Sequence, residues 1–173
     1  MVAGDLADYA LVRGAVDGND AVLSCIGLRV SGMAPWKSPL DVESFVKLNE
    51  NVTKAVKECG VKRAMVLSSG AVGSNRHKVS TALKLAVDMT VLAKVYVYLE
   101  QMEQMYEQVP GLDLCLVHPP LLTDEPLPTG KAHIVPGLYS LKGHISRIDL
   151  VTWMVSELEK PGPFQERRPF VST

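Results

Sequence analysis

The sequence predicts a three-layer α/β fold, in which a doubly wound, mostly parallel sheet lies between two layers of helices. Three apolar runs, each closed by Gly, Ser or His, have the composition of strands buried on both faces: residues 20–26, 61–69 and 112–118. Segments that favour helix alternate with these runs, and no internal repeat is present. Because parallel neighbouring strands need a crossover between them, this alternation predicts right-handed crossovers with helices on both faces.

The segment between the first two runs predicts a helix over residues 38–59. Ser38, Pro39 and Asp41 are typical of an N-cap, a first-turn proline and a capping box. Gly60 occupies the position where a glycine ends a helix. The first pair of strands is therefore joined by a capped helix.

The second half of the chain predicts two more helices, over residues 79–109 and 149–160. Residues 119–137 are rich in turn residues and predict a long loop with one short strand at 133–135. A last strand is expected at 168–171, where it closes one edge of the sheet.

Composition limits the classes of function. The 173 residues suit one domain, and 47% hydrophobic with 21% charged residues can form a folded core. A net charge of -1 gives no field to hold nucleic acid or an anionic membrane. Three widely spaced cysteines, with no metal-ligand spacing, are typical of a reducing compartment. Without a targeting or membrane-spanning segment, we expect a cytoplasmic protein with no metal, no nucleic-acid partner and no membrane partner.

Candidate chemistry lies where the predicted strands end, because ligands of open α/β sheets bind at the carboxyl ends of the strands. Ser68 and Ser69 offer hydroxyl groups there, although serine and glycine are also common wherever a strand becomes a loop. His118 is the histidine best placed for a ligand contact, and a satisfied structural histidine is the alternative.

Several familiar motifs do not occur. No G-x-G-x-x-G follows a strand, and neither a P-loop nor a G-x-S-x-G elbow is present. Tyr96 is followed four residues later by Glu100, and Tyr98 by Met102, so no tyrosine has a lysine on the same helix face to favour its ionisation. The tyrosines and methionines of residues 95–106 are interpreted as core residues.

The order of short motifs resembles the NAD(P)H-binding atypical short-chain dehydrogenases, the NmrA-like group, over nearly the whole chain. The motifs are Gly4-Asp5-Leu6 with residues 20–27, Gly60–Arg63 into Ser68-Ser69, Gly111–Asp113 into Val117–Pro120, Leu122–Asp124 and Ile145–Asp149. Within the group, the flavin reductase or biliverdin-IXβ reductase branch is the most similar, on Gly27, Arg29, Asn51, Ser69, Pro119-Pro120, Asp124, Pro126 and Leu127.

The resemblance implies one Rossmann-like domain over residues 1–173 that takes NADP or NAD, and an oxidoreductase that passes a hydride to a flavin, a biliverdin-like or a quinone-like small molecule. It also implies a catalytic role for Ser69 beside the hydride-transfer site, with the substrate under the loop 123–137. The cofactor-binding residues that it implies are Asp5, Leu6, Ile26, Gly27, Leu28, Arg29, Leu67, Ser68, His118, Pro119, Pro120 and Leu121.

The chain departs from the family pattern in three ways. It starts at the family's third strand, so that we expect an N-terminally truncated fold without the Gly-rich βαβ opening that holds the pyrophosphate. Leu121, Gln104 and Met105 stand where the flavin reductase has proton-handling residues, and His118 stands where relatives have arginine. A non-catalytic, NmrA-like nucleotide-sensing regulator and a truncated pseudo-enzyme are therefore alternatives. The open sheet edge predicts self-association.

Overall fold

The computed structural model describes residues 4–28, 41–70, 72–126, 128–137 and 143–173. At its centre lies a parallel sheet in the order β1 (Ala21–Ser24), β2 (Arg63–Leu67) and β3 (Asp113–Val117). Arg63 lies opposite Ala21 on one side and Asp113 on the other. All three predicted central strands are confirmed, although each is shorter than the apolar run that contains it.

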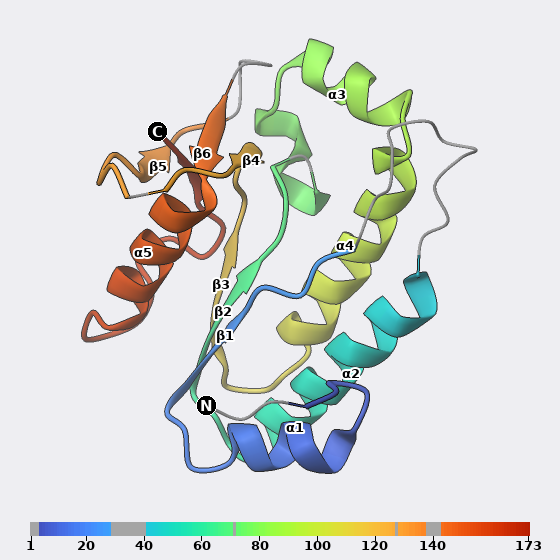
Figure 1. Cartoon of the computed structure of the whole chain (residues 1–173), viewed down its shortest axis with the longest axis vertical. Helices are drawn as coiled ribbons and strands as arrows, with labels where there is room; N and C mark the ends of the chain where they lie inside the picture. The colour runs from blue at the N-terminus through green and yellow to red at the C-terminus, as the bar shows by residue number, and fades with distance from the viewer. Residues whose placement is uncertain (1–3, 29–40, 71, 127, 138–142) are drawn as a thin grey trace.

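Helices cover both faces of this sheet (Figure 1). One face carries α1 (Tyr9–Val16), α2 (Val42–Glu58) and α4 (Leu92–Glu107), and the other carries α5 (Arg147–Leu158). Each layer has its own hydrophobic cluster, and Leu150 and Met154 fill the one beneath α5. The predicted three-layer α/β architecture is therefore confirmed.

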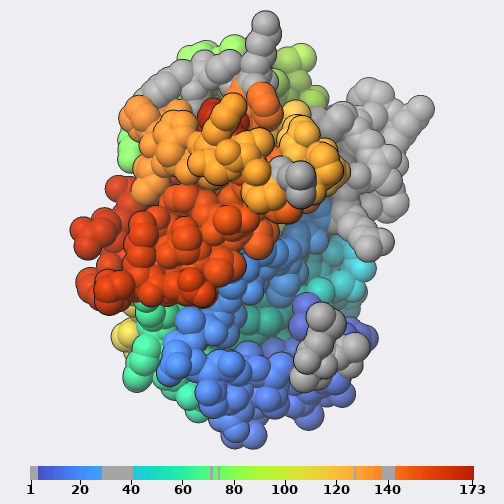
Figure 2. Space-filling model, turned by 60° about the vertical axis from the view of Figure 1, so that its left-hand side comes forward, coloured from blue at the N-terminus to red at the C-terminus, as the bar shows by residue number. Residues whose placement is uncertain are grey.

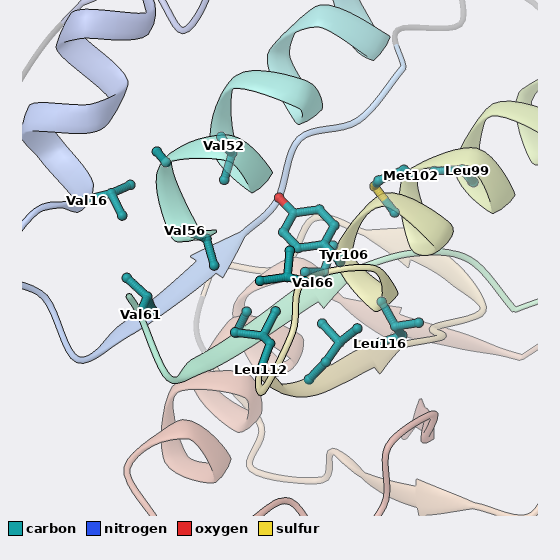
Figure 3. Packing of buried hydrophobic residues seen from close by; sticks show 14 of the residues in the cluster. Val16, Val52, Val56, Val61, Val66, Leu99, Met102, Tyr106, Leu112 and Leu116 are labelled. Carbon is teal, nitrogen blue, oxygen red and sulfur yellow. The ribbon is translucent and has the colours of Figure 1, made fainter. Parts of the chain in front are cut away.

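The larger cluster lies between the sheet and the layer of α1, α2 and α4. Figure 3 shows Tyr106 of α4 with its ring among Val52, Val56 and Val66. Burial raises the pKa of Tyr106 to about 12, and the Ser24 hydroxyl opposes this rise. Neither hydroxyl meets the geometry of a hydrogen bond with any of the described residues. The tyrosine and methionine stripe of α4 thus contributes to the core, as expected.

The C-terminal segment extends the sheet beyond β3. Leu116 N donates to Arg167 O at 2.8 Å and His118 N donates to Pro169 O at 2.9 Å. The chain then forms β7 (Phe170–Ser172), which pairs antiparallel with β5 (His133–Val135). The predicted strands at 133–135 and near 168–171 are confirmed, the latter shifted toward the C-terminus. The loop also contains a strand that was not anticipated, β4 (Leu121–Thr123), which pairs with β6 (His144–Ser146).

Two predicted helix starts were wrong. The N-cap of α2 is Asp41, whose carboxylate accepts from Ser44 N at 3.1 Å, while Ser38 and Pro39 lie outside the described residues. The N-cap of α5 is Ser146, which accepts from Asp149 N at 3.0 Å and starts the helix two residues before the predicted position. The predicted helix-ending role of Gly60 agrees with its φ of 67°.

The predicted long helix over 79–109 is divided. A 3-10 helix, η1 (Gly73–Lys78), comes first, and α3 (Thr81–Asp88) and α4 follow with a break between them. At the break, the Thr90 hydroxyl donates to Val87 O at 3.1 Å and accepts from Leu92 N at 3.4 Å. The side chain thereby competes with the helical hydrogen bonds of the backbone. No helix in the described ranges is long and apolar enough to span a membrane.

Candidate functional site

The carboxyl ends of the three central strands lie next to one another, which brings the predicted site segments together. Beyond the ends of the strands, Ser68 N donates to Val117 O at 2.8 Å and Gly70 N donates to Pro119 O at 3.1 Å. These bonds hold residues 68–70 beside residues 117–119. The parallel register therefore places the second and third predicted segments at one edge.

Ser69 forms a hydroxyl pair with a residue of α4. Its Oγ donates to the Tyr96 phenol oxygen at 3.0 Å. Burial raises the pKa of Tyr96, and the hydrogen bond from Ser69 and the charge of Arg76 oppose this rise. In the sequence, Tyr96 has no lysine on the same helix face. In the structure the nearby cation is Arg76 of η1, whose charge lowers the pKa of the phenol.

Glu103 of α4 is the centre of a buried polar network behind Ser69. Its Oε1 accepts from the Ser68 hydroxyl and from His118 Nε2, the latter at 3.0 Å. Its Oε2 accepts from Arg168 at 2.7 Å. The network joins the ends of β2 and β3 to α4 and to the C-terminal segment.

Glu103 is ionised in this environment. Burial alone would raise the pKa of this carboxyl. The hydrogen bonds that the carboxylate accepts from His118, Ser68 and Arg168 outweigh burial and hold the pKa below its ordinary value. The network therefore has a negative charge at its centre and an arginine beside it.

His118 is held in one tautomer within the same network. Asn75 Nδ2 donates to Arg168 O at 3.0 Å, and a carbonyl oxygen can only accept, so the amide orientation is determined. The same NH2 group lies 3.5 Å from His118 Nδ1, which indicates that the proton is on Nε2, facing Glu103. The imidazole is fully buried. Because the side chain is enclosed in this network, the predicted contact between His118 and a cofactor applies only to the His118 backbone, and it stays a prediction.

Three of the expected cofactor-binding residues, Asp5, Leu6 and Ile26, lie at the start of the chain and after β1. Leu6 and Ile26 line one groove of about 410 Å3, while Asp5 lines another of about 890 Å3. The buried Asn51 side chain donates to Leu6 O at 2.9 Å and to Ala7 O at 3.1 Å, which ties this loop to α2.

The other expected contacts fall into three groups. Gly27 is exposed and has open space where a side chain would be, so a ligand can approach its backbone, whereas Leu28 packs partly on the core. Leu67 and Pro120 are half-buried, Pro119 is buried and Leu121 is exposed. Arg29 lies outside the described residues.

Three residues of this site were missed by the sequence reasoning: Tyr96, Glu103 and Arg168. Glu103 had a detectable signal, since its neighbours on the helix face, Leu99, Met102 and Tyr106, are apolar, and a lone charge on a buried face needs partners. Arg168 had no detectable signal in the sequence, because its partners Glu103 and Glu107 lie more than 60 positions away.

The residues present fit two parts of a dinucleotide. The Ser69 hydroxyl follows β2 and pairs with Tyr96 of α4, which gives hydroxyl groups that can orient a nicotinamide. A groove lies along β1, and Gly27 beyond the strand has an open backbone. The turn that would cradle the pyrophosphate does not occur in this sequence. In the described ranges, no three or more His, Cys, Asp or Glu side chains are grouped as a metal site.

Comparison with solved structures shows the same fold in bacterial reductases. The anaerobilin reductase ChuY of Escherichia coli superposes with a TM-score of 0.70 at 18% identity, over 97% of this chain and 72% of that chain. A short-chain dehydrogenase/reductase of Veillonella parvula in complex with NADP superposes with a TM-score of 0.70 at 16% identity, over 99% of this chain and 71% of that chain. A Rossmann-fold NAD(P)-binding protein of Shigella flexneri superposes with a TM-score of 0.55 at 19% identity, over 98% of this chain and 68% of that chain.

No curated protein matches the sequence. A family model described as NAD(P)H-binding matches residues 1–161. The cofactor of this family is NADP or NAD. The chain belongs to this family of NAD(P)H-binding proteins.

Proposed function

We propose that this protein is an NAD(P)H-dependent reductase of small conjugated acceptors, namely a flavin, a biliverdin-like or a quinone-like molecule. The observation that carries the proposal is the hydroxyl pair of Ser69 and Tyr96 at the end of β2, in a chain of the NAD(P)H-binding family. Neighbours that act on or bind related molecules, the anaerobilin reductase and the NADP complex, support it.

The hydroxyl pair can orient an acceptor and supply a proton to it. When bound, the reduced nicotinamide would supply a hydride, which is two electrons and one proton. Because Ser69 Oγ donates to the Tyr96 oxygen, the phenol keeps its own proton for a hydrogen bond or transfer to the acceptor. Arg76 favours the phenolate that such a transfer leaves. The buried Glu103 carboxylate accepts from the hydroxyl of the adjoining Ser68 and so holds that side chain in place.

A kinetic comparison tests this role. NADPH oxidation is followed with riboflavin, biliverdin or a naphthoquinone as acceptor, for the wild type, Ser69→Ala and Tyr96→Phe. Both variants are expected to lower kcat by at least about tenfold while the dissociation constant of NADPH changes little. Ser156→Ala, which alters an exposed serine of α5, is the control and should behave as the wild type.

Two outcomes would contradict the proposal. An unchanged kcat in both variants removes the hydroxyl pair from the reaction. Binding of NADPH without turnover of any acceptor by the wild type contradicts hydride transfer and favours the nucleotide-sensing alternative.

A further inference from the structure

Helix α3 exposes apolar side chains on the side that faces away from the core. Leu85 is 58% exposed, and Met89, which directly follows the helix, is 70% exposed. On the other side of the helix, Leu83 and Val87 pack in a small hydrophobic cluster with Phe170. A helix that packs on its own domain through one face usually carries polar residues on the other, but α3 is apolar on both.

The exposed apolar residues form a continuous stripe along the helix. Successive residues of an α-helix are about 100° apart, so the stripe spans about 100° of the helix surface and about 10 Å of its length. Its members are Ala82, Leu85, Ala86 and Met89, and all four are exposed. An apolar patch of this kind marks a surface that binds a second apolar surface.

The charges next to the apolar stripe of α3 are basic. Lys78 precedes the helix, Lys84 lies on one flank of the stripe and Lys94 is in the first turn of α4. Asp88 is the one acidic residue of positions 71–99 in the sequence, and both of its carboxylate oxygens accept from Arg76 at 2.6 Å. Its charge is therefore already neutralised by an arginine.

The net charge of the whole chain conceals this local excess. A net charge of -1 predicts no membrane partner, because it provides no attraction to an anionic surface. Positions 71–99 contain four basic residues and one acidic residue, which gives this stretch a net charge of +3 with neutral histidine. The part of the chain that exposes the apolar stripe is thus cationic.

Helix α3 lies at one end of the molecule. Figure 1 shows it beyond the upper end of α4, at the end where β4 and β6 also lie. In Figure 2 the green atoms of α3 lie at the top and the blue atoms of α1 lie at the bottom. The apolar stripe therefore belongs to the end of the molecule opposite α1.

A bilayer surface fits the apolar stripe better than a protein partner does. A specific protein interface buries about 800 Å2 on each partner, from about 20–30 residues, whereas the stripe covers two turns of one helix. A helix that lies on a membrane instead inserts a few apolar side chains at the level of the headgroups, where flanking lysines reach anionic lipid. Leu85 and Met89 can insert in this way, and the three lysines provide the cations.

We propose that α3 docks on the surface of an anionic lipid bilayer, with its apolar stripe at the acyl chains and the three lysines at the headgroups. Docking requires no cofactor and does not rest on the proposed reaction. It would bring the Ser69 and Tyr96 pair close to the bilayer, because Tyr96 packs against the same hydrophobic cluster as α3. For the proposed reductase, this placement favours an acceptor that dissolves in lipid, such as a quinone-like molecule.

Co-sedimentation with lipid vesicles tests docking without any cofactor. The wild-type protein is mixed with vesicles of pure phosphatidylcholine, or with vesicles that contain about 30% phosphatidylglycerol as the anionic lipid. The binding constant should be at least about tenfold higher for the anionic vesicles. It should fall at high salt, because salt screens the attraction between lysines and headgroups.

Substitutions in the apolar stripe test which surface docks. Leu85→Glu and Met89→Glu should each lower the binding constant for anionic vesicles by at least about tenfold. Val151→Glu is the matched control, because Val151 of α5 is 42% exposed and the substitution adds the same charge. The control should bind as the wild type does, and circular dichroism checks that all three variants are folded.

A second pair of variants tests the lysines. Lys84→Gln should lower the binding constant for anionic vesicles by roughly fivefold, as expected for one lysine near an anionic surface. Lys47→Gln, at an exposed position of α2, removes the same charge elsewhere and should leave the constant unchanged. Equal losses in both variants would mean that net charge alone determines binding and would overturn the assignment to α3.

Three other outcomes are decisive. A wild type that does not bind anionic vesicles overturns docking, and if it also sediments as a dimer that Leu85→Glu dissociates, a second copy covers the apolar stripe. Equal losses in Val151→Glu and Leu85→Glu overturn the role of the stripe. A wild type that binds vesicles but reduces no acceptor contradicts the proposed function and supports docking.

Discussion

Replacing Arg168 with methionine would remove an arginine that donates to the buried Glu103 carboxylate and would keep an unbranched apolar side chain in its place. In the wild type, Arg168 donates to Glu103 Oε2 at 2.7 Å and to Glu107 Oε1 at 2.5 Å. The Glu103 side chain is 2% exposed, whereas that of Glu107 is 46% exposed. The first contact therefore lies in the protein interior and the second at the surface.

The size of the effect follows from these two contacts. A hydrogen bond to a buried charge contributes about 1.5–3 kcal/mol, and an exposed ion pair contributes about 0–1 kcal/mol. Glu103 keeps Ser68 and His118 as donors, so the cost stays below that of a wholly unpaired buried charge. We expect Arg168→Met to lower the free energy of unfolding by about 2–4 kcal/mol, or the melting temperature by about 4–16 °C.

Urea unfolding followed by circular dichroism at pH 7 measures this loss. Arg76→Met is the matched control, because Arg76 and its partner Asp88 are 37% and 52% exposed. The control should lose no more than about 1 kcal/mol. If Arg168→Met lost less free energy of unfolding than Arg76→Met, the buried ion pair would not stabilise the end of the sheet.

The pH dependence of the same pair of proteins provides a second check. The pKa of Glu103 is below its ordinary value of 4.5 in the folded protein, so its contribution is complete above that value and is lost as the pH falls through the folded pKa. Without Arg168 the folded pKa rises toward the unfolded one. The stability difference between wild type and Arg168→Met should therefore narrow in acid, and a difference that stays constant from pH 7 to pH 3 would refute this origin.

Two further substitutions test the interior. Tyr106→Phe removes a buried hydroxyl that has no partner among the described residues, and it should raise the free energy of unfolding by about 1 kcal/mol in the same urea assay. A decrease would reveal a hydrogen bond to that hydroxyl. Gly73→Ala should lower the free energy of unfolding more than Gly130→Ala does. Both glycines have positive φ, but a Cβ at Gly73 would lie 3.2 Å from Glu103 Oε2, whereas a Cβ at Gly130 would meet open space. Equal losses would show that the network makes room for a methyl group.

The strands were predictable from the sequence because a strand buried on both faces must be apolar throughout, and the run that contains Met65 and Val66 is an example. Helix boundaries were less predictable. Ser38, Asp41 and Ser146 are all residue types that cap helices. Asp41 is the N-cap of α2 and Ser146 is the N-cap of α5. The break near Thr90 depends on one hydroxyl group that bonds the backbone, which apolar periodicity does not reveal.

The candidate site was predictable only as far as the strand ends. Ser68 and Ser69 could be selected because position along a parallel strand determines which residues reach the ligand edge. The pairing of Ser69 with Tyr96 joins positions 27 apart, and the cation near Tyr96 belongs to another helix, so that no motif within one helix could reveal it. The role of Arg168 depends on the C-terminal segment lying beside β3, which is a property of the tertiary fold.

The central claim, that this chain binds NADP or NAD at the carboxyl edge of its sheet, is tested most directly by calorimetric titration with NADPH and NADH. The account predicts saturable micromolar binding of at least one nucleotide, with the affinity retained in Ser69→Ala because the proposed function places that serine at the reacting end. No heat and no change in nucleotide fluorescence up to millimolar concentration would contradict it, and would mean that the strand ends present here do not suffice to hold the cofactor.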